Sequence, residues 1–324
     1  MAGFVFATCL PGVEPALKLE VARTRPELRL AFSRPGLVTF KSPRPVALDD
    51  APGSVFAHVW GRSIGAASDP VTAGLQLSSL NATRVHVFAR VLDDGDEAPD
   101  LAPWQALGPG GPASPGELVA DIVVGAPGEP AWLGAHRHDR FRLPAAGGAI
   151  AVDVPADAPS RAYAKIEEAI AWAGLAVERG HTALEIGAAP GGAVLALARR
   201  GVDVWGVDPG ELAPGVLALA NVHHIAKKVG ALRWEDLPAR VDWLLVDVNL
   251  APQVALHEVA RFMPRLKSTL RGAVFTLKLN DWTFVSELPV LAERIRRMGF
   301  ADVRMRHLPS NRREICAVAL VHAP

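Results

Sequence analysis

The sequence has few of the residues that build disulfide-rich, zinc-binding or membrane proteins. Only two of its 324 residues are cysteines, Cys9 and Cys316, and their separation argues against a disulfide framework or a zinc cluster. No segment approaches the roughly 18 unbroken apolar residues of a membrane span. Residues 1–10 lack the positive charge that begins a signal peptide. We therefore expect a cytoplasmic protein that does not bind membranes.

An excess of positive charge is also missing. Lys+Arg and Asp+Glu both number 34. Residues 1–155 carry 13 basic and 16 acidic side chains, and residues 156–324 carry 21 and 18. Neither half is the strongly basic domain typical of nucleic-acid-binding proteins. Basic residues do gather locally near the end of the chain: Arg294, Arg296, Arg297, Arg304, Arg306, Arg312 and Arg313.

The first half shows the short, alternating strands of an α+β domain. The expected strands are residues 4–9, 37–40, 85–91, 118–124 and 131–135. A helix is expected at 13–22, and an element of either kind at 54–60. Residues 93–116 are acidic and rich in proline and glycine, which favours a loop. His136 and His138 could be metal ligands, although such a pair at a strand end is more often an ordinary polar one.

A break between two domains is expected at residues 152–161, where two prolines interrupt regular structure. Asp157 or Ser160 can cap the helix that follows. In that helix Lys165 precedes Glu168 by three residues, a spacing typical of a solvent-exposed ion pair. We therefore expect an N-terminal domain over 1–151 and a C-terminal domain over 152–324.

The most informative stretch reads T-A-L-E-I-G-A-A-P-G-G-A-V-L-A-L-A, at residues 182–198. An apolar strand, a turn of small residues and a helix follow one another, an arrangement that lets backbone amides approach a ligand. The glycines lack the G-x-G-x-x-G spacing of a dinucleotide-binding turn. The next strand, 202–207, ends in Asp208, which can accept hydrogen bonds from a ribose. Two readings stay open: an adenosine-containing cofactor, or a plain tight turn with Asp208 capping a helix.

Strands and helices alternate through the rest of the chain. A strand at 241–246 ends in Asp247, and a strand at 273–279 carries Lys278. The remaining expected elements are helices at 253–270 and 287–298 and a closing antiparallel pair at 302–307 and 315–321. This order predicts a seven-stranded, Rossmann-like α/β sheet of the class I methyltransferase type rather than that of a dehydrogenase.

Four residues resemble, in order and in element, the K-D-K-E tetrad of the FtsJ-like ribose 2′-O-methyltransferases: Lys165, Asp247, Lys278 and Glu314. The match is clearest over residues 152–324 and extends to the strings P-A-D-A-P-S-R at 155–161, G-A-A-P-G-G at 187–192, V-D-P-G at 207–210, L-K-L at 277–279 and R-R-E at 312–314. Within that superfamily the sequence is most similar to the ribosomal RNA large subunit methyltransferase M family. It departs from the family at Ala162, where a serine is usual, and at Ala193, where an aromatic residue is frequent.

The resemblance implies an enzyme that methylates an RNA ribose, such as a cytidine of 23S rRNA, with S-adenosylmethionine as cofactor and no metal. Lys278 would be the general base, and Lys165, Asp247 and Glu314 would position it. The residues expected at the cofactor are Ala162, Gly187, Ala189, Pro190, Gly191, Gly192, Asp208, Asp236 and Asp247. Those expected at RNA are Arg161, Arg312 and Arg313, together with the arginine cluster that begins at Arg294. The first half resembles in outline the family's N-terminal region, which includes an RNA-binding THUMP domain.

The same residues allow other interpretations. Each tetrad residue alone is more often a surface or strand-end charge, whereas all four in order beside a glycine turn favour the enzyme. A non-catalytic RNA-binding or ribosome-assembly protein stays open, because the first half looks shortened where the THUMP domain should be. A small-molecule methyltransferase would leave Lys165 and Glu314 without a role.

Overall fold

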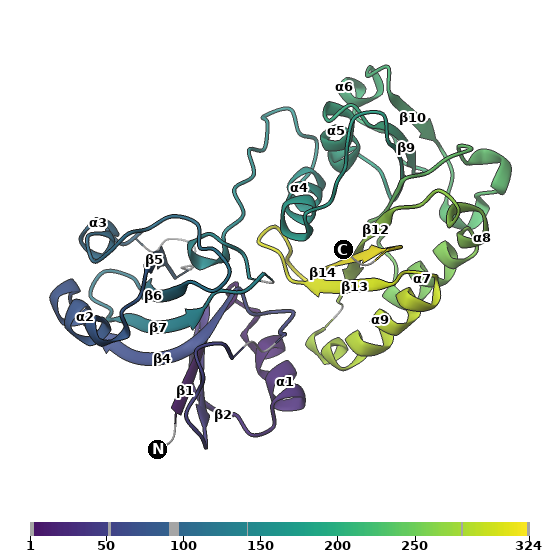
Figure 1. Cartoon of the computed structure of the whole chain (residues 1–324). Coiled ribbons are helices and arrows are strands. Elements are labelled where there is room, and N and C mark those ends of the chain that lie inside the picture. Colours follow the sequence, from purple (N-terminus) through teal and green to yellow (C-terminus); the bar gives the residue numbers. More distant parts are fainter. Residues whose placement is uncertain (1–2, 51–52, 91–96, 141, 280, 323–324) are drawn as a thin grey trace. The chain divides into compact units, whose positions relative to one another are not determined.

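The computed structural model describes residues 3–50, 53–90, 97–140, 142–279 and 281–322. The chain divides into two compact units, Met1–Ile150 and Ala151–Pro324, each built on one seven-stranded sheet (Figure 1). The predicted α/β class, with an α+β N-terminal part, is confirmed.

The sheet of the first unit has the strand order β2-β3-β1-β4-β7-β6-β5. β5 and β6 are parallel, and the other neighbouring strands are antiparallel. The strands are β1 (Gly3–Thr8), β2 (Arg29–Arg34), β3 (Leu37–Ser42), β4 (Val59–Ala67), β5 (Arg84–Ala89), β6 (Leu118–Val124) and β7 (Ala131–Arg137). The helices are α1 (Glu14–Thr24), α2 (Pro70–Leu77) and α3 (Ala102–Gln105), with short 3-10 turns at Ser78–Leu80 and Ala146–Gly148.

Several elements of this unit differ from the expected ones. β2 and α2 were not expected, and β4 begins where the element expected at 54–60 ends. β4 reads V-W-G-R-S-I-G-A-A, in which two glycines and a serine obscure the alternation of a strand. The segment expected as a loop contains α3, because Trp104 is buried and packs with Leu77 and Val85. Residues 91 and 93–96 of the expected elements lie outside the described residues.

His136 lies near the end of β7 and His138 directly after it, and both side chains are buried. His136 Nδ1 lies 2.6 Å from Oδ2 of Asp121 on the neighbouring strand. In the part of the chain that the structure describes, no three His, Cys, Asp or Glu side chains are grouped as metal ligands. The histidines therefore belong to the core of the first unit.

The sheet of the second unit has the order β10-β9-β8-β11-β12-β14-β13. Its strands are β8 (Thr182–Ile186), β9 (Asp203–Val207), β10 (Val222–Ile225), β11 (Trp243–Val246), β12 (Gly272–Lys278), β13 (Asp302–Arg306) and β14 (Glu314–Leu320). The first five strands in this order are parallel, and β14 runs antiparallel to both β12 and β13. The predicted Rossmann-like sheet with a closing antiparallel pair is confirmed.

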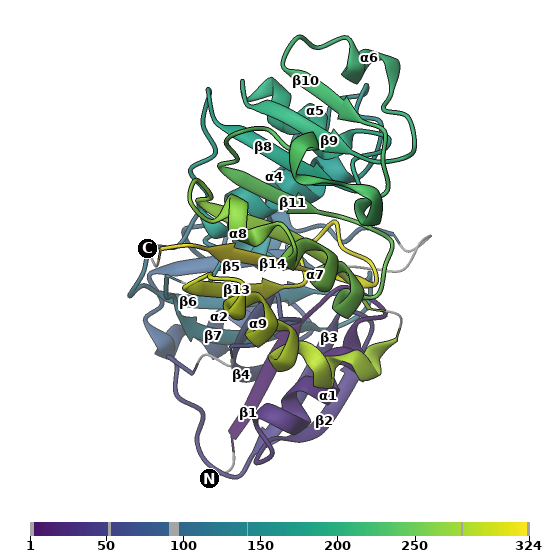
Figure 2. The same ribbon diagram turned by 90° about the vertical axis from the view of Figure 1, so that its right-hand side faces the viewer.

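Helices cover both faces of this second sheet. α4 (Ala162–Ala173) and α5 (Gly192–Arg199) lie on one face, and α7 (Pro252–Ala260), α8 (Met263–Leu266) and α9 (Leu288–Arg297) lie on the other (Figures 1 and 2). α4 turns Ile166, Ala169 and Ile170 inward and ends at Gly174, whose φ of +63° is the left-handed conformation that glycine favours. The single helix expected at 253–270 is two helices, α7 and α8. The remaining short elements are α6 (Pro214–Leu217) and the 3-10 turns Val229–Ala231, Trp234–Asp236 and Trp282–Glu287.

The chain order places a switch point in the middle of this sheet. From β8 the chain moves outward through β9 and β10, and it then returns to β11 on the other side of β8. Ligands of open α/β sheets bind outside the carboxyl ends of the strands at such a point.

The described residues include no helix long and apolar enough to cross a membrane.

At the amino-terminal ends of β8, β11 and β12, away from the switch point, the carboxylate of Asp242 joins the strands. This carboxylate is completely buried. It accepts hydrogen bonds from the Thr182 amide at 3.0 Å, from Arg240 Nη2 at 2.7 Å and from Arg271 Nε at 3.2 Å. Burial by itself would raise the pKa of Asp242, but the hydrogen bonds from Arg240, Thr182 and Arg271 outweigh it and lower the pKa to about 2. Asp242 therefore stabilises the folded chain in its ionised form.

We expect Asp242→Asn to lower the free energy of unfolding at neutral pH by roughly 1–3 kcal/mol, since three donors lose a charged acceptor. A carboxyl whose pKa is lowered by folding contributes its full stability above its unfolded pKa of roughly 3.9 and loses it as the pH falls through the folded pKa. The difference between wild type and variant, measured by urea unfolding, should therefore shrink between about pH 4 and pH 2. Asp157→Asn, at a side chain 65% exposed, is the control. A constant difference down to pH 2 would contradict this account.

Candidate active site

The glycine turn lies at the switch point of the second sheet and needs its glycines for close packing. Gly187 has a φ of +91°, and a Cβ there would lie 2.3 Å from the carbonyl oxygen of Asp247. Gly191 begins α5 with a φ of +107°. A Cβ on Gly192 would lie 2.3 Å from Oγ of Ser160, at the start of α4. The ends of β8 and β11 and the starts of α4 and α5 therefore meet around this turn.

Asp208 follows β9 and is bound to the same turn. Its Oδ2 accepts a hydrogen bond from the Ala189 amide at 3.1 Å, and its Oδ1 accepts one from the Gly210 amide at 2.8 Å. The next helix, α6, begins after Ala213, so the interpretation of Asp208 as a helix cap is wrong. Pro190 takes part through its carbonyl, which accepts from the Ala213 amide at 2.9 Å. The carboxylate fixes the backbone that the sequence predicts as a cofactor site.

Asp236 ends the 3-10 turn Trp234–Asp236. Its Oδ1 pairs with Lys227 Nζ at 2.5 Å, and its Oδ2 accepts from the Arg233 amide at 2.8 Å. The hydrogen bond from Lys227 is the main reason that the pKa of Asp236 lies below its usual range. Its predicted contact with the cofactor stays a prediction.

The four residues of the predicted tetrad form one connected chain of charges. Lys165 comes from α4, Asp247 directly follows β11, Lys278 ends β12 and Glu314 begins β14. Asp247 joins the lysines, because its Oδ1 lies 2.7 Å from Lys278 Nζ and its Oδ2 lies 3.2 Å from Lys165 Nζ. Lys165 Nζ also lies 2.8 Å from Oε1 of Glu314.

Two lysines in one cluster have unequal surroundings. Burial would lower the pKa of Lys165, but the charge of Asp247 and the contacts of Glu314 outweigh it and raise the pKa above its usual value. Lys165 is therefore held as a cation between two carboxylates. Lys278 has an ion pair with one carboxylate among the described residues, and its side chain is 23% exposed against 13% for Lys165. Lys278 is the more accessible lysine and has fewer anionic partners.

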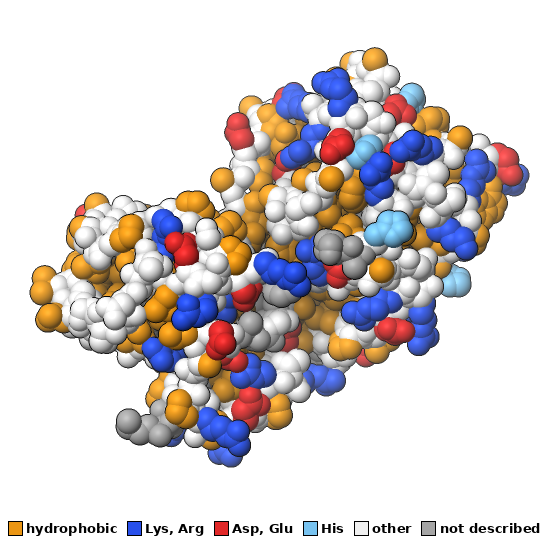
Figure 3. Space-filling model, in the orientation of Figure 1, with side chains coloured by type: hydrophobic (Ala, Val, Ile, Leu, Met, Phe, Trp, Pro, Cys, Tyr) orange, Lys and Arg blue, Asp and Glu red, His pale blue; other side chains and the backbone are white. Residues whose placement is uncertain are grey.

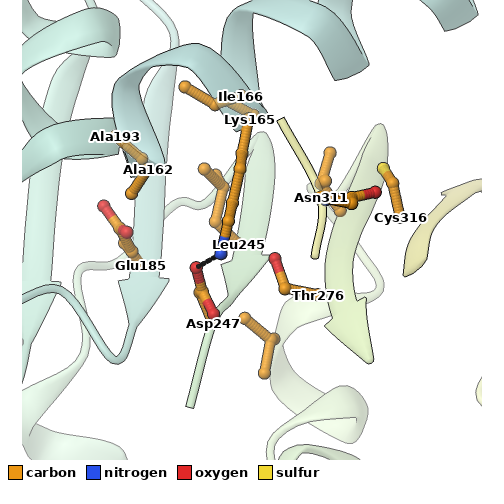
Figure 4. A pocket seen from close by; sticks show the side chains of 12 residues that line it. Ala162, Lys165, Ile166, Glu185, Ala193, Leu245, Asp247, Thr276, Asn311 and Cys316 are labelled. Atoms are coloured by element: carbon orange, nitrogen blue, oxygen red, sulfur yellow. Dashed lines mark hydrogen bonds and ion pairs between the residues drawn. The ribbon is translucent and has the colours of Figure 1, made fainter. Parts of the chain in front are cut away.

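A small cavity of about 20 Å³ lies beside the tetrad, lined by Ala162 and Lys165 on α4, by Glu185 on β8 and by Asn311 near β14. Figure 4 shows the side chain of Lys165 extending from α4 to Asp247, with Glu185 nearby. Glu185 is almost completely buried, and its Oε2 has no hydrogen-bond partner in the described structure. Burial above all, and then the charges of Asp247 and Asp208, raise the pKa of Glu185 well above its usual value.

Sequence reasoning missed Glu185 as a site residue, although a signal was present. A single acid in an otherwise apolar buried strand, two residues before a glycine turn, is costly unless it has a partner or a ligand. The same reasoning misassigned Glu168, which does not pair with Lys165 on an exposed helix face. Glu168 is buried and accepts from the amide and hydroxyl of Ser310 at 2.9 and 2.7 Å. It fixes the loop that precedes β14.

The predicted RNA-contacting arginines have different exposures. Arg312 and Arg313 are exposed directly before Glu314, and Arg161 is exposed and donates to the Ser310 carbonyl at 3.3 Å. Arg306 is buried at 8% exposure, so its place in an RNA-binding cluster is wrong. The α9 arginines lie on the surface, with Arg297 76% exposed, and Lys and Arg side chains are visible over this part of the second unit (Figure 3).

Comparisons with known proteins agree with the resemblance. No family model matches the chain. It is 34% identical over 215 residues to a protein of Alkalilimnicola ehrlichii, covering 63% of this chain and 53% of the relative. It is 37% identical over 171 residues to a protein of Halorhodospira halophila, covering 51% and 48%, and 32% identical over 181 residues to one of Chromohalobacter salexigens, covering 52% and 49%. All three relatives are named ribosomal RNA large subunit methyltransferase M, and the chain spans about half of their length.

Some solved structures resemble this chain, with low TM-scores. The fibrillarin pre-rRNA processing protein of Methanococcus jannaschii has a TM-score of 0.40 and 14% identity, over 62% of this chain and 82% of its own. TrmN from Thermus thermophilus has a TM-score of 0.35 and 17% identity, over 98% and 99%. From the sequence relatives, the chain is related to the proteins named ribosomal RNA large subunit methyltransferase M, as its motifs predicted.

Proposed function

We propose that this protein transfers a methyl group from S-adenosylmethionine to a ribose 2′-hydroxyl of RNA. The observation that carries the proposal is the convergence of Lys165, Asp247, Lys278 and Glu314 beside a glycine turn at the switch point of the sheet. The names of the sequence relatives support ribosomal RNA as the substrate, and a cytidine of 23S rRNA is the target that the resemblance implies. Such a substrate implies a cytoplasmic enzyme.

The residues around the turn fit the cofactor. The glycines pack the turn closely against Asp247, Val216 and Ser160. The Oε2 of Glu185 is a buried acceptor without a hydrogen-bond partner in the described structure. We propose that residues 187–192 and Ala162 line the cofactor site, that Asp208 faces the ribose of the cofactor, and that Asp236 and Asp247 lie toward its adenine and methionine ends. When bound, the cofactor supplies an electrophilic methyl group on a sulfonium.

The protein must then activate and orient the hydroxyl. A ribose hydroxyl is a weak nucleophile at neutral pH and needs a base within hydrogen-bond reach. We assign that role to Lys278, in its neutral form, because it is the accessible lysine. One carboxylate oxygen of Asp247 pairs with Lys278 and the other with Lys165. Glu314 also pairs with Lys165 and so holds it in place. Holding the hydroxyl in line with the methyl group would supply much of the acceleration.

RNA capture would involve both units. We propose that Arg161, Arg312 and Arg313 contact phosphates beside the tetrad and that the exposed arginines of α9 extend this surface. We assign residues 1–151 to RNA binding as a reduced THUMP-like domain. The intact tetrad favours an enzyme over a non-catalytic assembly protein with the same fold, since binding alone does not require a connected Lys-Asp-Lys-Glu chain.

The cofactor assignment predicts that Asp208→Ala weakens S-adenosylmethionine binding by roughly 1–3 kcal/mol, because a hydrogen-bond acceptor is lost. Isothermal titration calorimetry measures this directly. Asp203→Ala is the matched control, since Asp203 lies at the other end of β9 and pairs with His223. Tight binding of NADH without any binding of S-adenosylmethionine would refute the assignment.

The base assignment predicts that Lys278→Ala slows the chemical step by roughly 10²–10⁴-fold. Lys278→Arg should be nearly as damaging, because a guanidinium stays protonated and cannot accept the hydroxyl proton. Single-turnover methylation of ribosomal RNA measures both. Cofactor affinity should stay near that of the wild type, and Lys267→Ala, outside the site, should have no effect. A wild-type rate for Lys278→Arg would exclude Lys278 as the base.

The RNA assignment predicts that Arg312→Gln with Arg313→Gln weakens RNA binding and makes it less dependent on salt. Each lost phosphate contact should reduce the slope of log affinity against log salt by about one. Titration of labelled RNA at several salt concentrations measures the slope. Arg261→Gln, at an arginine 40% exposed that pairs with Glu258, is the control. Unchanged affinity and slope in the double variant would count against the assignment.

A further inference from the structure

The first unit contains a second candidate ligand site, in a cavity of about 270 Å³ lined by Phe32, Arg34, Leu37, Arg90, Val123 and Trp132 among others. These residues come from β2, β3, β6 and β7 and from the end of β5. β2 and β7 are not neighbours in the strand order, so the sheet curls to bring their side chains together. The tetrad has no part in this cavity.

Two aromatic rings form one wall of the cavity. The rings of Phe32 and Trp132 are nearly parallel, with an interplanar angle of 9° and centroids 5.7 Å apart. The Trp132 indole is fixed by a hydrogen bond from its Nε1 to Ser63 Oγ at 3.0 Å. Phe32 is 39% exposed, although a large aromatic side chain normally gains stability from burial. The ring pair therefore gives the cavity wall a partly exposed apolar surface.

Two guanidinium groups adjoin this face. Arg34 lies over the Phe32 ring, 5.4 Å from its centroid, and both Arg34 and Arg90 pair with Glu129, at 2.8 and 2.9 Å. Two cations against one carboxylate leave the cluster positive. Arg90 is more than nine-tenths buried, and its Nε has no hydrogen-bond partner in the described structure.

The segment of sequence that contains β2 and β3 is basic although the unit as a whole is not. Residues 15–45, which span most of α1 with β2 and β3, contain seven Lys and Arg against two Glu. A positive groove beside aromatic faces is the combination that binds single-stranded nucleic acid, because bases stack on the rings while cations contact the phosphates. The rings of this cavity can stack on the base of a nucleotide, and the adjacent guanidinium groups can contact its phosphate.

We propose that this cavity binds a nucleotide of single-stranded RNA, with its base stacked on the Phe32–Trp132 pair and its phosphate facing Arg34 and Arg90. The site rests on the proposed function in that RNA is the substrate. It gives the first unit a specific role, because it holds an unpaired nucleotide of the substrate at a place separate from the methylated ribose. Recognition through a ring face is tolerant of base identity, so the site supplies affinity rather than sequence selection.

The test uses the full chain and two fluorescently labelled probes of equal length, oligoadenylate and an abasic ribose-phosphate oligomer. We expect the wild type to bind oligoadenylate more tightly in anisotropy titrations. Phe32→Ala should weaken that binding roughly 5- to 150-fold, as expected for the loss of one base stack. It should leave binding of the abasic probe unchanged, and Phe32→Tyr, which keeps the ring, should restore wild-type affinity.

Two further variants keep the result interpretable. Leu30→Ala removes a more exposed apolar side chain, 55% exposed against 39% for Phe32, from the same strand outside the cavity, and should change nothing. Arg34→Gln leaves both rings in place and should lower affinity for both probes and reduce the salt slope by about one. Arg34→Gln therefore tests the site even if Phe32→Ala unfolds the first unit.

The outcomes separate this site from the proposed activity. Equal affinity for the two probes, or wild-type affinity in Phe32→Ala and Arg34→Gln, overturns the site even when Lys278→Ala abolishes methylation. Base-dependent binding that requires Phe32 supports the site even when no methylation is detected. Binding of the wild type to neither probe overturns it as well, and would leave β2 as an edge strand open to a peptide.

Discussion

The candidate active site depends on the carboxylate of Asp247, which binds two lysines at once. Each of its oxygens pairs with one ammonium group, at 2.7 Å for Lys278 and 3.2 Å for Lys165. Its backbone is equally constrained, because its carbonyl oxygen lies where any side chain at position 187 would have to fit. One residue therefore couples the tetrad to the glycine turn. A shift of β11 along the sheet would move both the lysine contacts and the wall of the proposed cofactor site, so the proposed chemistry depends on strand register as much as on side-chain identity.

That register comes from the sheet itself. Trp243–Val246 pairs in parallel with both Ala183–Ile186 and Gly272–Phe275, and the antiparallel pairing of β12 with β14 sets Lys278 opposite Glu314. The buried Asp242 binds the other ends of these strands through Thr182 and Arg271. Strand pairing thus makes Lys278 and Glu314, which are 36 positions apart in sequence, direct neighbours. α4 supplies the remaining lysine, and Glu168 on the same helix fixes the loop before β14 through Ser310.

Most strands and helices of the second unit could be predicted from the sequence, but fewer of those in the first unit could. Buried parallel strands are largely continuous apolar runs, acids follow β9 and β11, and the glycine turn has a distinctive pattern. β8, β9, β11 and β12 could therefore be predicted to within a few residues. The tetrad followed from resemblance, whereas the partner of Lys165 did not follow from helical spacing, because Glu168 is near in sequence but bonded elsewhere. In the first unit, β4 is rich in small residues and β2 is an exposed edge, so neither carries the alternation on which such predictions depend. Trp104 likewise gave no sign that a proline-rich segment would pack into the core.

Charge distribution explains why the proposed RNA binding has no sign in the net charge of this chain. Net charge is a sum over a domain, but a phosphate interacts with the few cations within roughly a Debye length of 8–10 Å. In the first unit an acidic remainder cancels the basic segment 15–45, and in the second unit the acids of the sheet and the tetrad cancel exposed arginines such as Arg312 and Arg313. Several of these acids, among them Asp242, Glu185 and Glu314, are buried and little felt by a polyanion at the surface. A neutral chain can therefore present local positive surfaces to RNA, and burial decides which charges count.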